Sequence, residues 1–553
     1  MLPNQTTTYT LTATNSYGTR TQEVTVTVEA AQNQVCEGDI DATTQAEVDA
    51  LDSCSSIEGS LTIGGNDPNA IVSLQSLENL ERVDGDLVIG VGRFSAFEAI
   101  DGNAVLPSLS GLDNLEFVGG HLTIIGNHAL TSLEGLDNLV SIGGDVVIGD
   151  VVQVPLLGLG SFEDWPIGND LLVSLKGLEK LTSIRGSLIV GQNKLLTSLE
   201  GLNNVSSIDG SLLIDGNLVL PSLTGLNQLS SVGEAVVIGR FDVFGGASSI
   251  SLEGLNNLVS IGTTLHIIGP INSLLPLANV ETAESIEIVS SALTNLAGLE
   301  KITTLSELTV ARNENLISLE GLTALASVGK VRLEQNSSLM SLQGLSALAS
   351  VGELSIFEEQ TLVSLAGLEN LTSLSSLEIT GSPNLTSLQG IEGLASINDL
   401  KLFNMSVTSF APLTNFNVTN SLSVIRSNIT SFAGLEGTTL LLGGLIVDNN
   451  PALTSLAGLE NVRIVGGVAF MIAANPLLES LDDLDALEII RSYIVIMDNG
   501  LTSIAELDNI RGYRDNMLNV NISGNTNLDC SPPPDLPFVV DISNGNAVNC
   551  PRP

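Results

Sequence analysis

A Ser-Leu step that recurs at nearly constant intervals is the feature that most constrains how this chain can fold. The step occurs 18 times, usually 22 to 25 residues apart, with Asn in place of Ser in one coil and Phe or Ile in place of Leu in some. The positions are Ser73, Ser108, Ser132, Ser174, Ser198, Ser222, Ser251, Ser273, Asn295, Ser318, Ser341, Ser364, Ser387, Ser409, Ser431, Ser455, Ser480 and Ser503. Such a period indicates units that bury their apolar side chains only by stacking on their neighbours. Stacking also explains how 553 residues fold, since a single compact core rarely exceeds about 250–300 residues.

Residues 130–149, LTSLEGLDNLVSIGGDVVIG, show what one unit contains. Its first four apolar positions, from Leu133 to Ile142, are spaced by three, which favours short turns with the apolar side chains inward. Val146 and Ile148 are spaced by two, as in a strand with one buried face. The repeat therefore predicts a mainly β chain that forms a parallel β-solenoid of about 18 leucine-rich coils.

Two polar columns accompany the repeat. Nine coils place an asparagine five residues before the serine, at Asn103, Asn127, Asn169, Asn193, Asn217, Asn313, Asn336, Asn450 and Asn475. Stacked side-chain amides can satisfy the backbone groups of neighbouring coils at a corner. We expect the asparagine column to be a structural ladder of this kind, and the serine column to do similar work at another corner.

The charge balance restricts the partners. The chain has 62 acidic and 19 basic residues and a net charge of −43. Because such a surface would not neutralise phosphates, nucleic acid and anionic membranes are poor partners. The sequence has no run of 18 or more apolar residues, so we expect no insertion into a membrane.

The four cysteines form two local pairs, one on each side of the repeats. Cys36 and Cys54 precede the coils, and Cys530 and Cys550 follow them. A disulfide at a solenoid end would add roughly 3 kcal/mol by restricting the unfolded chain. Free thiols are the alternative, but local pairing at both ends favours disulfide-stapled caps and an oxidising compartment. Because the first residues lack the pattern of a signal peptide, we expect a fragment of a longer chain.

The stretch that begins at Cys36 resembles the start of the receptor L domain of growth-factor and insulin receptor ectodomains, and of fungal and bacterial surface proteins with the same repeat. The matching elements are Cys36, Cys54, Gly59, Leu61 and Ile63, followed by coils of the form L-x-x-L-x-x-I-x-G-x-L-x-I to about residue 528. The closing DCSPPPDLPF resembles a leucine-rich-repeat C-terminal cap. The resemblance implies a right-handed solenoid, a surface location and a binding role. The chain departs from this family in having many more coils and no cysteine-rich module, so no particular ligand is implied.

Residues 1–30 indicate a separate unit. YTLTATNSYGTRTQEVTVTV predicts two alternating strands around an Asn-Ser-Tyr-Gly turn. It resembles the last hairpin of an immunoglobulin-like or PKD-type domain of bacterial surface proteins. An isolated hairpin is marginal in water, so either the rest of that domain lies outside this sequence, which we favour, or the hairpin pairs with another chain. The remaining boundaries place an N-terminal cap at 31–60, the solenoid at 61–528 and a C-terminal cap at 529–553.

Three intervals between ladder serines are unusually long, and the extra residues share a motif. Each insertion follows a strand that ends in Val-Ile-Gly, at Gly90, Gly149 and Gly239, so we expect the three to leave the same edge of the solenoid. The motif is G-x-F-x-x-aromatic, as GRFSAF, GSFEDW and GRFDVF. The candidate ligand-binding residues in these insertions are Arg93, Phe94, Phe97, Phe162, Trp165, Arg240, Phe241 and Phe244.

The same coils carry an apolar stripe at the outward middle position of each strand. It consists of Val88, Thr123, Val147, Ile189, Leu213 and Val237, and the position turns polar at His266, Glu287, Arg332, Glu378 and Lys401. Six exposed aromatic side chains would exceed the apolar patch that a soluble monomer normally shows. Either the insertions fold onto the stripe and shield it, or insertions and stripe form a groove for a partner, with Glu163 and Asp164 on its rim beside the two arginines.

Catalytic or metal-binding chemistry is sparse. The chain has three histidines, none in a ligand-like cluster with cysteine, so we expect neither a zinc site nor a nucleophile. The neighbouring His266 and Glu287 could serve a polysaccharide-active enzyme, but a solvated polar face is the commoner explanation. Weak Ca²⁺ binding by scattered aspartates is the single cofactor expectation. A threonine column before the serines raises ice binding, which Pro221 and Met340 argue against by interrupting it.

These observations predict an extracellular, non-enzymatic surface module for adhesion or ligand binding. Its partner would be a protein or glycan on another surface. A structural spacer or an assembly subunit joined through the hairpin at 1–30 is the alternative from a different class.

Overall fold

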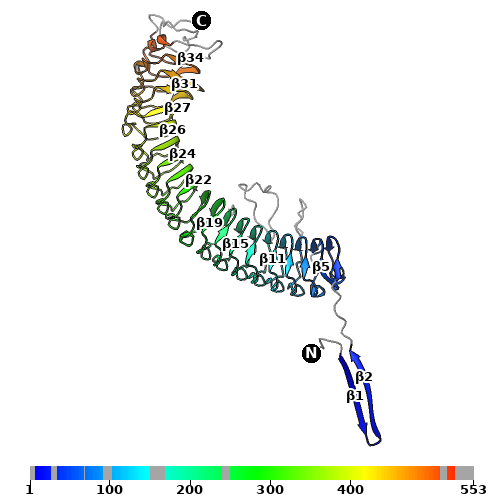
Figure 1. Cartoon of the computed structure of the whole chain (residues 1–553). Coiled ribbons are helices and arrows are strands. Elements are labelled where there is room, and N and C mark those ends of the chain that lie inside the picture. Colours follow the sequence, from blue (N-terminus) through cyan, green and yellow to red (C-terminus); the bar gives the residue numbers. More distant parts are fainter. Residues whose placement is uncertain are drawn as a thin grey trace. The chain divides into compact units, whose positions relative to one another are not determined.

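The computed structural model describes residues 7–26, 34–65, 67, 69–90, 102–149, 168–239, 249–510 and 520–529. The chain divides into two compact units, Met1–Leu220 and Pro221–Pro553, and each is described by itself. In both units, successive strands lie side by side in sequence order, one coil after another (Figure 1). The predicted leucine-rich parallel β-solenoid is therefore confirmed.

The first unit contains a parallel sheet with one strand from each coil. Its strands are β4 (Ile40–Ala42), β6 (Leu61–Ile63), β8 (Leu87–Gly90), β10 (Leu122–Ile125), β12 (Val146–Ile148), β14 (Leu188–Gly191) and β16 (Leu212–Asp215). Shorter strands pair on an adjacent side: β3 (Gln34–Cys36), β5 (Cys54–Ile57), β7 (Arg82–Val83), β9 (Phe117–Val118) and β11 (Ser141–Ile142), and then β13 (Ser183–Ile184) with β15 (Ser207–Ile208). Register is kept from coil to coil, as in the alignment of Leu122 with Leu87 and Val146.

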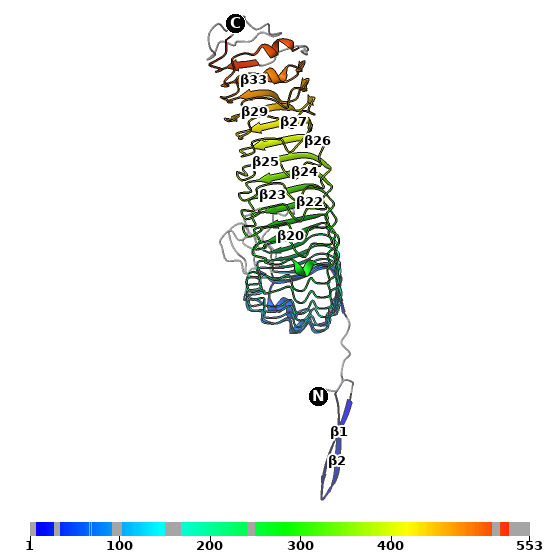
Figure 2. The ribbon, with the colours of Figure 1, turned by 90° about the vertical axis from the view of Figure 1, so that its left-hand side faces the viewer.

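The second unit continues the same pattern with longer strands. Its main sheet contains β18 (Val236–Gly239), β20 (Thr264–Ile268), β21 (Ser285–Val289), β22 (Thr304–Ala311), β23 (Ser327–Glu334), β24 (Ser350–Phe357), β25 (Ser373–Thr380), β26 (Ser396–Phe403), β27 (Asn417–Ile425), β29 (Gly444–Asp448), β31 (Ala469–Ala473), β33 (Tyr493–Met497) and β34 (Val520–Ser523). The short strands are β17 (Ser231–Val232) with β19 (Ser260–Ile261), and β28 (Leu440–Leu441) with β30 (Ile464–Val465) and β32 (Ile489–Ile490). From β22 to β27 the short and main strands merge into strands of eight or nine residues, which lie next to one another in Figure 2.

Helical structure is minor among the described residues. It comprises α1 (Gln45–Asp49) and the short 3₁₀ helices η1 (Gln75–Leu77), η3 (Leu275–Leu277), η4 (Asp482–Leu484) and η5 (Ala505–Asn509). None of the helices in this part of the chain is long and apolar enough to cross a membrane.

The core consists of the columns of Leu, Ile and Val that the spacing predicted. Leu133, Leu136 and Leu139 are fully buried, as are the equivalent residues of most other coils. Burying one such side chain contributes about 1.5–3 kcal/mol, so the columns supply the main favourable free energy of folding. Phenylalanine replaces leucine in part of the second unit, where the rings of Phe410 and Phe432 stack with their centroids 5.7 Å apart.

The asparagine ladder is confirmed and is longer than predicted. In most steps an amide Oδ1 accepts the backbone N–H of the preceding coil, as Asn169 does for Asn127 at 3.0 Å. The amide Nδ2 donates to a strand carbonyl, as Asn169 does to Ile124 at 2.9 Å. The ladder also includes Asn499 and Asn525, while Ser291, Glu359, Ser382 and Ser427 take asparagine positions in other coils.

The serine column differs from its expected role. The serine Oγ accepts the N–H two residues further along its own coil, as Ser108 does from Ser110 at 3.0 Å. It thus closes a local turn rather than joining neighbouring coils. Threonines at the preceding position make the bonds between coils instead, as Thr197 Oγ1 does to Val173 O at 3.1 Å.

The N-terminal cap contains the expected disulfide between Cys36 and Cys54, whose Cα atoms are 5.8 Å apart. Helix α1 contacts β4 and η1 of the next coil, and its capping box joins Thr44 and Glu47. Cys530 and Cys550 lie outside the described residues, so the second disulfide stays a prediction.

The predicted N-terminal hairpin is present. Strands β1 (Thr7–Asn15) and β2 (Gly18–Val26) pair antiparallel in continuous register, from Thr7 with Val26 to Asn15 with Gly18. The residues from 8 to 25 are exposed on both faces of this ribbon. Tyr17, at the turn, is 97% exposed.

Candidate binding face

The aromatic insertions that the sequence singled out lie outside the described residues. This holds for Arg93, Phe94, Phe97, Phe162, Trp165, Arg240, Phe241 and Phe244. The structure shows where each insertion begins, at Gly90, Gly149 and Gly239, all with positive φ. A Cβ on Gly90 would lie 1.7 Å from Ile125 O, so the backbone here passes too close to the next coil for any side chain.

The outward side chains of β21–β27, together with the residues that directly follow β22, β24 and β27, form what we call the polar sheet face. Its acidic residues are Glu287, Glu307, Glu334, Glu353, Glu358, Glu378 and Asp399, and its basic residues are Arg312, Lys330, Arg332, Lys401 and Arg426. The face thus has seven acidic and five basic residues, a much more even balance than the 62 acidic and 19 basic residues of the whole chain. Basic side chains are therefore concentrated on this face of an otherwise strongly acidic protein.

Opposite charges on the face lie next to one another. Arg332 Nη2 is 2.5 Å from Glu334 Oε2, and Arg312 approaches the other oxygen of Glu334 at 3.8 Å. Between neighbouring strands, Lys330 Nζ is 3.4 Å from Glu307. Exposed pairs of this kind stabilise the fold little, about 0–1 kcal/mol each, so stability alone does not account for the concentration of charge.

Two arginines lie against phenylalanine rings on this face. The guanidinium of Arg332 is 5.0 Å from the ring centroid of Phe357, and that of Arg426 is 5.5 Å from that of Phe403. Phe403 is 37% exposed although it is a large apolar side chain. Arginine and aromatic side chains are the residue types that contribute most to protein interfaces.

The N-terminal margin of the face has a different character. Burial lowers the pKa of His266 to about 4, so its imidazole is neutral at pH 7. Burial, and then the nearby Glu307 carboxylate, raise the pKa of Glu287. The 3.7 Å approach of His266 Nε2 to Glu287 therefore joins a neutral imidazole to a carboxyl group. Within the described ranges, no three His, Cys, Asp or Glu side chains are grouped so that they could hold a metal ion.

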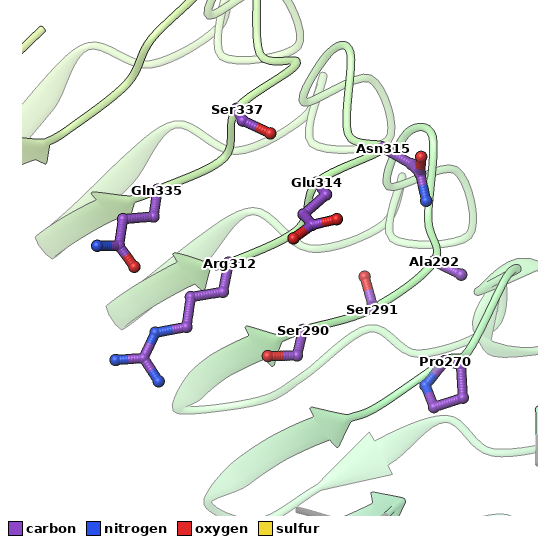
Figure 3. Close-up of a pocket in the computed structure, with 9 residues that line it drawn as sticks. All are labelled: Pro270, Ser290, Ser291, Ala292, Arg312, Glu314, Asn315, Gln335 and Ser337. Carbon is purple, nitrogen blue, oxygen red and sulfur yellow. The ribbon is translucent and has the colours of Figure 1, made fainter. Parts of the chain in front are cut away.

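A groove of about 530 Å³ borders the face where the strands end (Figure 3). Ser290, Arg312 and Gln335 follow β21, β22 and β23 with φ values of 54°, 57° and 55°, a conformation that turns the chain sharply out of the sheet. Glu314 and Asn315 stand on the opposite side of the groove.

The groove exists because two consecutive corners are short. Two residues separate the ladder residue Asn313 from the core residue Leu316, whereas one separates Ser291 from Leu293. In the preceding coil Pro270 is followed at once by the buried Ile271. The missing corner residues leave a hollow beside the full-length corners that follow.

The sequence indicated only part of this face. The outward middle position identified Glu287, Arg332, Glu378 and Lys401, and the structure aligns them on neighbouring strands of one sheet. Phe357, Phe403 and the corner residues were missed. The two phenylalanines could have been found from the period of two in a strand, because a residue two positions after the middle one faces the same side of the sheet.

No protein-family model matches the sequence, and no curated protein does. Among solved structures, the chain is similar to an internalin (inlF) from Listeria monocytogenes str. 4b F2365, with 16% identity and a TM-score of 0.31 over 67% of this chain and 86% of that one. It is also similar to TLR13 in a complex with ssRNA13, with 18% identity and a TM-score of 0.32 over 88% and 72%. A third similarity is to the leucine-rich-repeat ectodomain of the plant membrane receptor kinase GASSHO1/SCHENGEN3 from Arabidopsis thaliana, solved with CASPARIAN STRIP INTEGRITY FACTOR 2, with 12% identity and a TM-score of 0.19 over 89% and 80%. At these values the similarities add nothing to the fold that the strand pairing already establishes.

Proposed function

We propose that this chain is a non-enzymatic binding module of an extracellular surface, and that its polar sheet face contacts a protein or glycan partner. The observation that carries the proposal is the composition of this face. Five of the chain's 19 basic residues gather there, two of them against phenylalanine rings. A surface that only kept the solenoid in solution would need neither the arginines nor the exposed ring of Phe403.

The extracellular location rests on the N-terminal disulfide. Disulfides persist in oxidising compartments, and Cys36–Cys54 closes the end of the solenoid, where an unpaired coil would otherwise be open to water. The resemblance to receptor L domains points to the same location.

The aromatic insertions are the second part of the proposal. Phe94, Trp165 and Phe241 belong to insertions that start at equivalent glycines of their coils. We propose that these side chains contact the partner rather than only shield the apolar stripe. Replacing all three with Ala should then abolish binding and leave the melting temperature nearly unchanged. A large drop in melting temperature without any effect on binding would support shielding instead.

The polar sheet face is tested with panels of purified extracellular proteins and of surface glycans, measured by biolayer interferometry at physiological salt. A partner that uses this face should lose at least tenfold in affinity with Arg332→Ala or Arg426→Ala, since each removes an arginine with an aromatic neighbour. Lys176→Ala is the matched control. Lys176 lies outside the main sheet, where its Nζ is 3.5 Å from Glu200 Oε2. A partner whose affinity falls only with the control substitution would contradict the proposal.

An assembly role has one observation in its favour. The hairpin β1–β2 exposes both faces and two long strand edges, the arrangement that adds to another β-strand. If the hairpin joins chains, removing residues 1–30 should reduce the number of chains per particle, as calculated from the mass measured by light scattering. An unchanged number of chains per particle would exclude this role.

A further inference from the structure

A glycine in the corner after the serine has a recurrent hydrogen bond. Its N–H donates to the side chain two residues further along the same coil, at 2.8 to 3.2 Å, in ten coils. These glycines are Gly111, Gly135, Gly177, Gly225, Gly254, Gly298, Gly367, Gly390, Gly434 and Gly458. Eight of the ten acceptors are Asp or Glu carboxylates, and the other two are Asn. The corner thus has a backbone donor that is built to hold a carboxylate.

Two consecutive coils lack this acceptor. Gly321 and Gly344 have the same positive φ, 115° and 110°, but Thr323 and Ser346 occupy the position of the acid. Neither N–H makes a hydrogen bond within the described part of the chain. Both glycines are buried residues, and Gly344 lies at the space that the shorter side chains leave. Gly201 also makes no such bond within the described residues, but Gly177 and Gly225 in the two neighbouring coils do.

That space is a hollow of about 450 Å³. Thr323 and Ser346 line it, and Gly344 contributes its backbone. At the end of the hollow stands Glu369, whose own carboxylate caps Gly367 at 3.0 Å. The filled corner of the next coil therefore shows which chemical group fits the two open ones.

An exposed apolar stripe adjoins the hollow. Ile317, Met340 and Val363, each directly before a ladder serine, are 51%, 54% and 55% exposed. In eight other coils this position is a threonine, as at Thr430, whose Oγ1 donates to Thr408 O at 3.3 Å. Other coils also lack this threonine, as at Val72 and Val173, but around the hollow three consecutive coils expose an apolar side chain at this position.

We propose that this corner binds a carboxylate of a polypeptide partner, an Asp or Glu side chain with an apolar neighbour in its sequence. One carboxylate oxygen accepts from Gly344 N–H and the other from Gly321 N–H, on coils about 5 Å apart. The apolar neighbour packs on Ile317 and Met340. Glu320 and Glu369 repel a free anion, so the apolar contact is required, and a second copy of this acidic chain is a poor occupant. The site is separate from the polar sheet face and goes beyond the proposed function.

The experiment is a titration of the deuterated, ¹⁵N-labelled full chain, followed through the amide signals of Gly321 and Gly344. The probes are the peptide acetyl-Leu-Glu-Leu-amide, its Gln analogue, and acetate. We expect saturable shifts of both glycine signals with the Glu peptide. The Gln peptide should bind about tenfold more weakly, as expected for losing a charge-assisted hydrogen bond. Acetate should be weaker than the Glu peptide and should gain affinity with salt, which screens the two glutamates.

Substitutions that fill the site from within provide a test that does not depend on unfolding. Thr323→Glu with Ser346→Glu supplies the acceptors that Glu300 and Glu369 supply in other coils, so it should abolish peptide shifts while the melting temperature stays the same or rises. Thr439→Glu with Thr454→Glu adds the same charge on other coils and should leave binding unchanged. Ile317→Thr with Met340→Thr should weaken the peptide but not acetate. Absence of glycine shifts with every probe would overturn the site, and equal affinity for acetate and peptide would overturn the polypeptide partner.

Discussion

Glu359 shows how much one ladder position can depend on its side chain. Its Oε1 accepts from both Nδ2 and the backbone N–H of Asn336, at 2.8 and 3.2 Å, in place of the usual asparagine. The residue is fully buried, and its Oε2 finds no hydrogen-bond partner among the described residues. A buried carboxyl in this position is costly when ionised.

Burial raises the pKa of Glu359 from 4.5 to about 7, with a smaller contribution from the Glu334 charge. Because this folded-state pKa lies above the unfolded one, the folded chain holds a proton that the unfolded chain has lost. Stability should therefore fall as the pH rises from about 4.5 to about 7, by roughly 2–3 kcal/mol from this group. Glu359→Gln should remove this part of the pH dependence and stabilise the chain at pH 8. Urea unfolding between pH 4.5 and 8 measures it. Glu353→Gln, which removes an exposed carboxylate, is the control, and a wild-type pH profile in Glu359→Gln would contradict the assignment.

At the scale of elements, the strands and the corners have different tolerances. Strand positions are set by pairing in continuous register and by fully buried side chains, so they accept little change. Corners vary from coil to coil, and the candidate sites lie there or on the outward strand face. The stacked Phe410 and Phe432 lie outside the strands but tolerate as little change, because each is fully buried and fills the space of a core leucine with a larger ring.

Phe410→Ala should destabilise the chain by about 3–5 kcal/mol, because the cavity cannot be refilled by the neighbouring coils. Phe410→Leu restores the residue type of the other coils and should cost much less. Chemical denaturation of both variants gives the comparison. Equal losses would mean that the aromatic contact, rather than the filled volume, stabilises these coils.

The sequence predicted those elements that depend on periodicity. The coil, its strand, the leucine columns and the asparagine ladder all follow from spacings of two, three and about 23 residues, and the Cys36–Cys54 bridge from the position of its cysteines. The prediction that the serine column joins neighbouring coils was wrong. The hydroxyl lies two residues before an N–H of its own coil and accepts that hydrogen bond instead. The open glycine donors could not be foreseen, since their meaning depends on which acceptor the other coils place at the same corner.

At the scale of the whole chain, the dominant physical fact is the net charge of −43 on an array in which contacts join mainly neighbouring coils. Like charges on stacked coils repel, and the repulsion opposes the folded state more than the expanded one. Stability should thus depend strongly on ionic strength.

We expect the melting temperature to rise by several degrees between 20 mM and about 300 mM NaCl, as the screening length falls to less than 10 Å. Calorimetry measures this rise directly. KCl should act like NaCl, because screening depends on ionic strength and not on the identity of the cation. A response to one of the two salts alone would indicate a specific ion site instead.

The short corners at Pro270 and Ser291 have a consequence for engineering. The number of residues in these corners changes while β20, β21 and β22 keep their pairing unbroken. The length of a corner can therefore vary without disturbing the sheet. Foreign peptides grafted between Ser291 and Leu293 would be carried beside a rigid sheet at a fixed spacing. The inserted peptide could then be exchanged without redesigning the solenoid that carries it.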